Sequence, residues 1–281
     1  MTKSLSNEKA YHFSTFYRFT DIADPQNLRQ NLQKLGDDLG IIGIILIAAE
    51  GLNSTIAGDK SAIDSFLGHL RELPGFYNLE VKSSRAVLKR RPFRKLKVRV
   101  KREIVTMGLD DIDAANDAGI RVEPEQWDQL IRDPDVLVID TRNVYEYRLG
   151  TFEGAEDPRT LNFRQFPEAV RGMLEKSGHK KVAMFCTGGI RCEKATAYVR
   201  RLGVDEVYHL HGGILNYLEK IPKERSSWNG ACFVFDGRIT VNHSLQPEAR
   251  PLCTVCGQVM TRDSDESDYQ CHQCMEFPMV K

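Results

Sequence analysis

The chain has 281 residues and no formal net charge at pH 7, with 41% hydrophobic and 28% charged residues. This composition is typical of a globular, soluble protein, and the length allows two or three domains. No apolar run reaches the roughly 20 residues of a membrane-spanning helix, and the polar N-terminus lacks the apolar core of a secretory signal. We therefore expect a cytoplasmic protein that does not bind membranes.

Strand and helix signals alternate over the first hundred residues. Asp24 followed by Pro25 is typical of a helix start, because aspartate caps the helix and proline is favoured at its first position. Asp59 is the corresponding cap of a second helix. The predicted elements are a strand over 11–22, a helix over 25–39, a strand over 41–49, a turn over 50–53, a strand over 54–57, a helix over 60–73 and a strand over 79–87. This β-α-β-β-α-β order predicts a ferredoxin-like α+β sandwich, which we assign to residues 1–108.

A dense basic stretch follows, with nine lysines and arginines and no acid between Lys89 and Arg102. Residues 96–101 alternate with period two, which predicts a strand with one charged face. One interpretation is a solvated edge strand whose charges prevent aggregation. The density of charge favours a second interpretation, contact with nucleic-acid phosphates. The residues predicted to bind RNA are Lys89, Arg90, Arg91, Arg94, Lys95, Lys97, Arg99 and Lys101.

An acidic linker over 109–119 leads to a second predicted domain, residues 120–222. Its predicted elements are a helix over 124–133, a strand over 136–140, a helix over 165–176, a strand over 182–185, a helix over 192–202 and a strand over 206–210. This alternation predicts an α/β domain with a parallel sheet and helices on both faces. Sites in such folds lie at the carboxyl ends of the strands, where Asp140, Cys186 and His211 are expected.

The segment from Cys186 to Arg191 joins a buried-looking strand to a helix through a glycine-rich loop. Such a loop directs several backbone N–H groups to one point, and we expect Thr187, Gly188, Gly189 and Ile190 to supply them. The helix N-terminus and the Arg191 guanidinium both favour a thiolate, so Cys186 is the predicted nucleophile and Arg191 its anion-stabilising partner. The alternatives are a Cys186 that acts as a small buried hydrophobe and an Arg191 that forms a salt bridge outside the loop.

The remaining cysteines suggest further thiol chemistry. Seven cysteines in a cytosolic chain are typical of reactive thiols and metal ligands, not of a disulfide framework. Cys192 either resolves an oxidised Cys186 by closing a disulfide or points into the core. Fourteen residues separate two Cys-x-x-Cys pairs in the C-terminal extension, residues 223–281. That spacing suits a tetrahedral zinc site formed by Cys253, Cys256, Cys271 and Cys274, and free thiols are the alternative.

Residues 120–220 resemble a rhodanese domain. The resemblance rests on Val138-Ile-Asp140-Thr-Arg142, Glu146, Gly154-Ala155, the loop from Cys186 to Arg191, and Leu210-His-Gly-Gly-Ile214. It implies that Cys186 carries a persulfide. The four residues between Cys186 and Arg191 make a shorter loop than that of related phosphatases, which favours a sulfur-sized anion. The resemblance to rhodanese domains also implies that Asp140, Arg142 and Glu146 brace the loops.

The whole chain, over roughly residues 11–275, resembles the oxygen-dependent tRNA uridine hydroxylases, which install 5-hydroxyuridine at the wobble position. Ala49-Glu-Gly-Leu-Asn53 and Trp228–Asp236 carry this resemblance. It implies molecular oxygen as co-substrate and the tRNA anticodon arm as partner, and no flavin or nicotinamide signature is visible. We retain two alternatives, a sulfurtransferase acting on a small thiol or tRNA and a non-catalytic RNA-binding adaptor.

Overall fold

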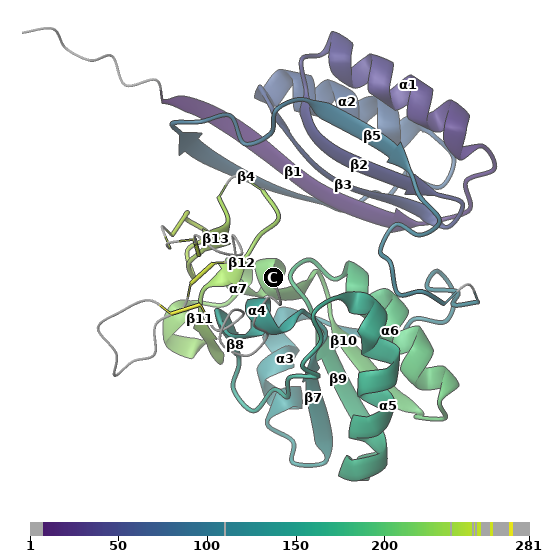
Figure 1. Ribbon diagram of the computed structural model, residues 1–281, viewed down its shortest axis with the longest axis vertical. Helices are drawn as coiled ribbons and strands as arrows, with labels where there is room; N and C mark the ends of the chain where they lie inside the picture. Colours follow the sequence, from purple (N-terminus) through teal and green to yellow (C-terminus); the bar gives the residue numbers. More distant parts are fainter. Residues whose placement is uncertain are drawn as a thin grey trace, which may run out of the picture. The chain divides into compact units, whose positions relative to one another are not determined.

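The computed structural model describes residues 8–109, 111–236, 238–248, 250, 252–253, 259–260 and 270–271 (Figure 1). The chain divides into two compact units. Unit 1 comprises Met1–Thr106 with Phe235–Arg238, and unit 2 comprises Met107–Val234 with Ile239–Lys281. No helix of the described part of the chain is long and apolar enough to cross a membrane.

Unit 1 is a five-stranded sheet with two helices. Its elements are β1 (Lys9–Phe19), α1 (Pro25–Asp38), β2 (Ile42–Ala48), β3 (Gly51–Gly58), α2 (Lys60–Glu72), β4 (Val81–Leu88) and β5 (Leu96–Val100). The strand order is β4-β1-β3-β2-β5, and all neighbours are antiparallel except β5, which runs parallel to β2. The first four strands thus have the ferredoxin-like arrangement, which confirms the predicted fold of this region.

Local signals place the two helices. Asp24 Oδ1 accepts hydrogen bonds from the backbone N–H groups of Gln26 and Asn27 at 3.1 and 2.9 Å, so its predicted capping role is confirmed. Asp59 occupies the N-cap position of α2, but its side chain accepts no hydrogen bond from that helix. Both helices cover one face of the sheet, where Phe66 of α2 and Leu32 of α1 are fully buried (Figure 1).

The predicted hairpin turn is present but shorter than the range 50–53. It consists of Ala49 and Glu50, because β3 already begins at Gly51, which pairs with Ala48 of β2. Gly51 has φ +145°, and a Cβ there would lie 2.1 Å from the carbonyl oxygen of Arg18, so only glycine fits. Glu50 Oε1 accepts from the Ile104 N–H at 2.7 Å, and the Asn53 side chain donates to the Ile104 carbonyl at 3.1 Å. The Glu50-Gly-Leu-Asn53 motif therefore clamps the chain that leaves β5.

The charged strand is confirmed as an edge strand with two different faces. Leu96 and Val98 of β5 are buried beneath the helices, whereas Lys97 and Arg99 are exposed. This alternation is what a strand covered on one side requires.

The parallel sheet predicted for unit 2 is confirmed. It has the strand order β6-β10-β9-β7, in which β6 is an additional strand that the sequence did not predict. Its elements are β6 (Ile120–Val122), α3 (Pro124–Ile131), β7 (Val136–Asp140), α4 (Val144–Tyr147), β8 (Gly150–Phe152), a 3-10 turn (Phe163–Gln165), α5 (Phe166–Ser177), β9 (Lys181–Phe185), α6 (Ile190–Arg201), β10 (Glu206–Leu210), α7 (Gly213–Lys220), a 3-10 turn (Lys223–Arg225), β11 (Trp228–Gly230), β12 (Cys232–Phe233) and β13 (Thr240–Val241). Helix α6 begins at Ile190, two residues earlier than predicted, which brings the helix N-terminus closer to Cys186.

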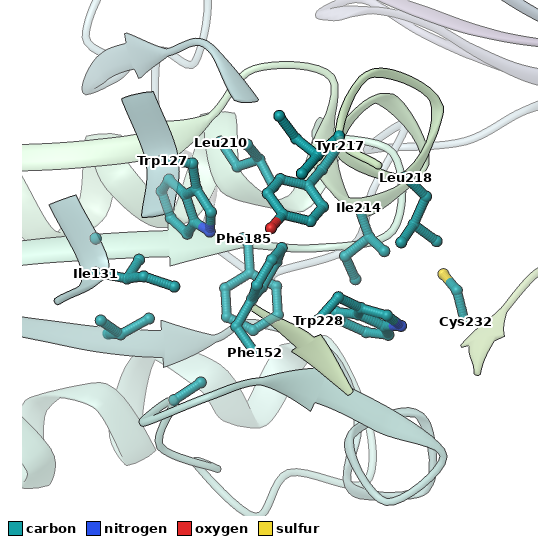
Figure 2. Close-up of a cluster of buried hydrophobic side chains, with 14 of the residues drawn as sticks. Trp127, Ile131, Phe152, Phe185, Leu210, Ile214, Tyr217, Leu218, Trp228 and Cys232 are labelled. Carbon is teal, nitrogen blue, oxygen red and sulfur yellow. The ribbon is translucent and has the colours of Figure 1, made fainter. Parts of the chain in front are cut away.

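An aromatic cluster joins the elements of unit 2 (Figure 2). The Phe152 ring of β8 lies at its centre, with ring centroids 4.7 Å from Tyr217, 4.8 Å from Phe185, 5.2 Å from Trp228 and 5.8 Å from Trp127. These contacts are edge-to-face, the favourable geometry for aromatic pairs. Because Trp228 belongs to β11, the cluster fixes the start of the C-terminal extension against the parallel sheet.

We expect Phe152→Ala to lower the free energy of unfolding by about 3–5 kcal/mol, because it leaves a cavity among four rings. Chemical denaturation followed by tryptophan fluorescence measures this loss. Ile120→Ala is the control, because Ile120 is 56% exposed and its truncation should change stability by no more than about 0.5 kcal/mol. Equal effects of the two substitutions would contradict the central role of Phe152.

Candidate active site

The loop from Cys186 to Gly189 connects β9 to α6 at the carboxyl edge of the parallel sheet. The Gly189 backbone N–H donates to Cys186 Sγ at 3.1 Å. Gly189 has φ +103°, a conformation that favours glycine and turns its N–H toward the sulfur. Cys186 is only 1% exposed, so its sulfur is surrounded by protein.

The surroundings of Cys186 favour its thiolate. Burial alone raises the pKa of Cys186, but a hydrogen bond from the Cys192 side chain, the charge of Arg191 and the backbone N–H groups of Cys192 and Gly189 together lower that pKa to about 5. The thiolate is therefore the main form at neutral pH, and it is the nucleophilic form of cysteine.

The backbone at the start of α7 holds the loop by hydrogen bonds. The N–H groups of Ile214 and Leu215 donate to the carbonyl oxygens of Cys186 and Thr187 at 2.9 and 3.1 Å. Gly213 has φ +66°, and a Cβ there would lie 2.4 Å from the Cys186 carbonyl oxygen. Glycine is thus required both by the backbone conformation and by the close approach of the two segments.

Arg191 forms a bidentate ion pair with Glu146. Its Nη1 and Nη2 donate to Glu146 Oε2 and Oε1 at 2.8 and 2.7 Å, and both side chains are buried. Burial raises the pKa of Glu146, but the charge and hydrogen bonds of Arg191 outweigh it and the pKa falls below its usual value. The guanidinium thus forms the salt bridge that the sequence left open as an alternative, and its charge also lowers the pKa of Cys186. Its role as the anion-stabilising partner in a reaction stays a prediction.

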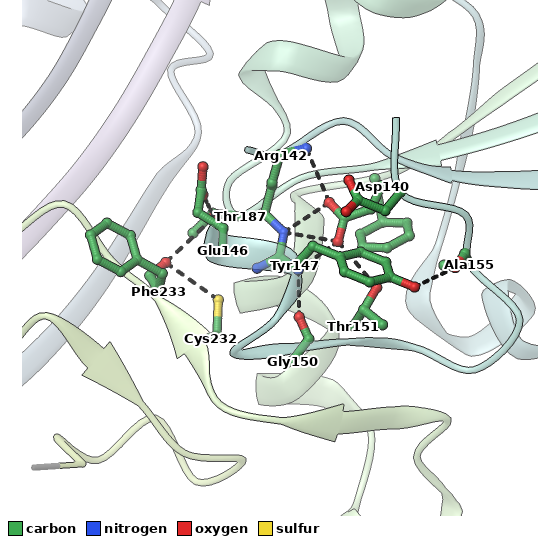
Figure 3. A network of polar contacts seen from close by, with 12 residues as sticks. Asp140, Arg142, Glu146, Tyr147, Gly150, Thr151, Ala155, Thr187, Cys232 and Phe233 are labelled. Atoms are coloured by element: carbon green, nitrogen blue, oxygen red, sulfur yellow. Dashed lines mark hydrogen bonds and ion pairs between the residues drawn. The ribbon is translucent and has the colours of Figure 1, made fainter. Parts of the chain in front are cut away.

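A second buried ion pair lies beside the first (Figure 3). Arg142 Nη2 donates to Asp140 Oδ2 at 2.6 Å, and the Thr151 hydroxyl donates to the same oxygen at 3.1 Å. Arg142 also donates to the carbonyl of Gly150, and its guanidinium lies 5.2 Å from the Trp228 ring centroid. The predicted bracing role of Asp140 and Arg142 is confirmed, since they join β7 to β8.

Cys192 lies in the first turn of α6 and is fully buried. Burial, the hydrogen bond to Cys186 and the negative charge of Cys186 all raise the pKa of Cys192, which stays a thiol. Its sulfur is 3.7 Å from the Thr141 hydroxyl oxygen. A thiolate and a neutral thiol in hydrogen-bond contact are the starting arrangement for disulfide formation.

Sequence reasoning left Cys232 without a role, yet the structure buries it beside this site (Figure 3). Burial raises the pKa of the Cys232 thiol to about 12, although the nearby Arg142 charge lowers it. The Thr187 hydroxyl donates to the carbonyl of the adjacent Phe233 at 3.5 Å. Only the resemblance of the 228–236 segment to a family signature pointed to this region.

Other predicted residues lie apart from the thiol or outside the described residues. The His211 ring hydrogen-bonds to Glu123, on the chain that follows β6. Cys253 is buried and Cys271 half-buried, while Cys256 and Cys274 lie outside the described residues. Among the residues that are described, no group of three or more histidine, cysteine or acidic side chains is arranged to hold a metal ion. The zinc site stays a prediction.

Comparison with known proteins separates the same two parts of the chain. Residues 11–104 match the UPF0176 acylphosphatase-like domain, and residues 123–220 match the rhodanese-like domain. A tRNA uridine(34) hydroxylase of Rhizobium leguminosarum is 46% identical over 98% of this chain and 90% of its own length. The chain belongs to the tRNA uridine(34) hydroxylase family. Hydroxylases of this name from Gluconobacter oxydans and Sinorhizobium medicae are 53% and 51% identical, over 85% and 90% of this chain and 77% and 78% of their own.

In this member of the tRNA uridine(34) hydroxylase family, we expect Cys186 to remain a thiolate at neutral pH. It should become protonated as the pH falls through about 5, which is its pKa. The ultraviolet absorbance of the thiolate should be present at pH 7 and absent from Cys186→Ser. In the double variant Glu146→Gln/Arg191→Met the ion pair is replaced without leaving a lone buried charge. The pKa of Cys186 should then rise toward its unperturbed value of about 8.5. An unchanged titration would show that Arg191 does not control this thiol.

Proposed function

We propose that this chain hydroxylates uridine 34 of tRNA at C5 with molecular oxygen, and that the Cys186 thiolate takes part in the reaction. Membership of the tRNA uridine(34) hydroxylase family is the observation that carries the substrate and the reaction type. The low pKa of Cys186 supports the role of its sulfur, because an inert structural cysteine would be protonated. A cytoplasmic location agrees with a tRNA substrate.

The stoichiometry of the reaction defines what the thiols must supply. One oxygen atom of O2 enters the C5–H bond, and the other leaves as water, which consumes two electrons and two protons. We propose that Cys186 and Cys192 supply both electrons by closing a disulfide. Because Cys186 starts as a thiolate, the Cys192 thiol releases one of the two protons and solvent supplies the other. An external thiol reductant then restores the two cysteines. Their side-chain hydrogen bond supports this pairing, and Cys192 acts as the resolving thiol.

The remaining predicted residues have supporting roles in this proposal. The loop residues Thr187 to Ile190 hold the thiolate through their backbone, and Arg191 stabilises its charge. The basic residues that connect β4 to β5, together with Lys97, Arg99 and Lys101, bind phosphates of the anticodon arm. Cys253, Cys256, Cys271 and Cys274 hold a structural zinc ion, a role that their spacing supports.

Nucleoside mass spectrometry of tRNA tests the proposed reaction. In a strain that lacks this gene, the wild-type chain should restore 5-hydroxyuridine, whereas Cys186→Ser and the double variant Glu146→Gln/Arg191→Met should not. Growth under ¹⁸O2 should place the label in the product. Ile120→Ala serves as the folded control with an intact site.

Two results would count against this function. Restoration of 5-hydroxyuridine by Cys186→Ser would remove the thiolate from the reaction. Loss of a thiolated nucleoside from the deletion strain, with 5-hydroxyuridine unchanged, would favour the sulfurtransferase that the rhodanese loop also allows.

The resolving role predicts a specific disulfide. Mild peroxide should join Cys186 to Cys192 in the wild-type protein, seen by peptide mass spectrometry as the loss of two hydrogens. In Cys192→Ser, oxidation of Cys186 should proceed to the sulfinic acid, because no adjacent thiol traps the sulfenic acid. Cys232→Ser is the matched control and should leave the Cys186–Cys192 disulfide unchanged. A Cys186–Cys232 disulfide in the wild-type protein would contradict the assignment.

A further inference from the structure

One face of the unit 1 sheet is covered by α1 and α2, and the other carries a different set of side chains. Tyr11 and Phe13 of β1 point to this second face, whereas Phe16 points to the helices. We call the second face the Tyr11 face. One end of it is occupied, because Phe93 packs against the Tyr11 cluster and the Arg238 guanidinium lies 4.8 Å from the Phe13 ring centroid.

The strand registers define a row of side chains that crosses the Tyr11 face next to this occupied end. The row consists, strand by strand, of Lys82, Thr15, Thr55, Ile44 and Lys97. We call it the Thr15 row. The hydroxyls of Thr15 and Thr55 are 3.2 Å apart, and Lys97 is exposed. Ile44 is 40% exposed although β2 is an interior strand of the sheet.

A neighbouring row adds an aromatic ring and a further cation. Tyr17 of β1 pairs with Asn53, and the register continues through Leu46 to Arg99 at the edge. Tyr17 is half-buried, with its ring edge-to-face to Phe19 at 6.2 Å between centroids, and Arg99 is exposed. The two rows thus place an apolar floor, hydroxyls and an aromatic ring between cationic ends.

A surface that binds unpaired nucleotides typically combines apolar and aromatic side chains, hydroxyls and cations. The bases of these nucleotides stack on aromatic and apolar side chains, their 2′-hydroxyls bond to polar groups, and their phosphates pair with lysine and arginine. A protein partner of comparable size would favour a floor with fewer cations at its edge. We propose that the Thr15 row and Tyr17 bind unpaired nucleotides of the tRNA. This inference rests on the proposed tRNA substrate and extends the proposed RNA surface from Lys97 and Arg99 of the basic segment across β2, β3, β1 and β4.

Ile44→Glu tests the surface by placing an anionic side chain on the floor of the row. The probe is a labelled RNA hairpin with an anticodon-arm sequence, and its affinity is measured by fluorescence anisotropy. We expect at least a tenfold weaker affinity, because the carboxylate repels phosphates and hinders stacking. Val87→Glu is the matched control: Val87 is 57% exposed in β4, on the opposite face to its neighbours Ala86 and Leu88, and the hairpin affinity should stay within twofold of wild type.

Two further measurements separate stacking from general charge attraction. Tyr17→Ala should weaken hairpin binding by roughly 5- to 150-fold, the usual range for one stacked base, and should weaken binding of a fully paired duplex much less. Lys97→Ala should weaken both RNAs and reduce the slope of log affinity against log salt by about one. The Cys186 titration should be unchanged in every variant, which separates this surface from the thiol chemistry.

Three outcomes would overturn the proposal. Hairpin affinity within twofold of wild type in Ile44→Glu would exclude the row as an RNA surface. Equal losses in Ile44→Glu and Val87→Glu would show an effect of net charge alone. A change in the sedimentation of Ile44→Glu, with RNA affinity intact, would mean that the face contacts protein. Because hairpin binding is measured without hydroxylation, a failure of the proposed reaction leaves this test intact.

Discussion

The buried charge of the Cys186 sulfur is the constraint on which the arrangement of unit 2 depends. An ionised group that is removed from water is stable only when charges and hydrogen bonds replace its hydration. Arg191 provides the opposite charge, but its guanidinium is buried as well and needs a partner of its own. Glu146 is that partner, because its two carboxylate oxygens accept hydrogen bonds from the two Nη atoms of Arg191 at 2.7 and 2.8 Å. The Arg191 guanidinium therefore stabilises two anions, the Cys186 thiolate and the Glu146 carboxylate.

This group needs a rigid frame, because removal of one buried charge leaves the others uncompensated. Glu146 accepts from the Asn143 N–H at 3.1 Å, so the start of α4 fixes the carboxylate. The Asp140–Arg142 pair fixes the chain just before α4. Trp228, which lies over Arg142, belongs to the same aromatic cluster as Phe152. Stability of the core and ionisation of the thiol are thus coupled through a few contacts.

Signals that act within a few residues were readable from the sequence. The Asp24–Pro25 helix start, the alternating faces of β5 and the glycine loop before α6 are each set by local backbone geometry. The Arg191–Glu146 pair was not readable, because 45 residues separate the two side chains. Periodicity shows which side of an element is buried, but it does not show which charge on another element lies opposite. The extent of the turn near Gly51 was predicted wrongly for a related reason. The glycine is required by its φ of +145° and by the close approach of Arg18 on the neighbouring strand, and the sequence does not show this contact.

The burial of Cys186 also limits how a uridine can reach it. At 1% exposure, the sulfur is not in contact with any surface on which a folded RNA helix could lie. A base that reacts at Cys186, as we propose, must leave its stack and enter the protein, as in other enzymes that modify bases. Unstacking costs free energy, and contacts made by other nucleotides of the same RNA can offset that cost. A surface that favours unpaired nucleotides, such as the Thr15 row, would stabilise the opened form of the RNA specifically. Binding in unit 1 would then contribute to chemistry in unit 2 through the substrate itself.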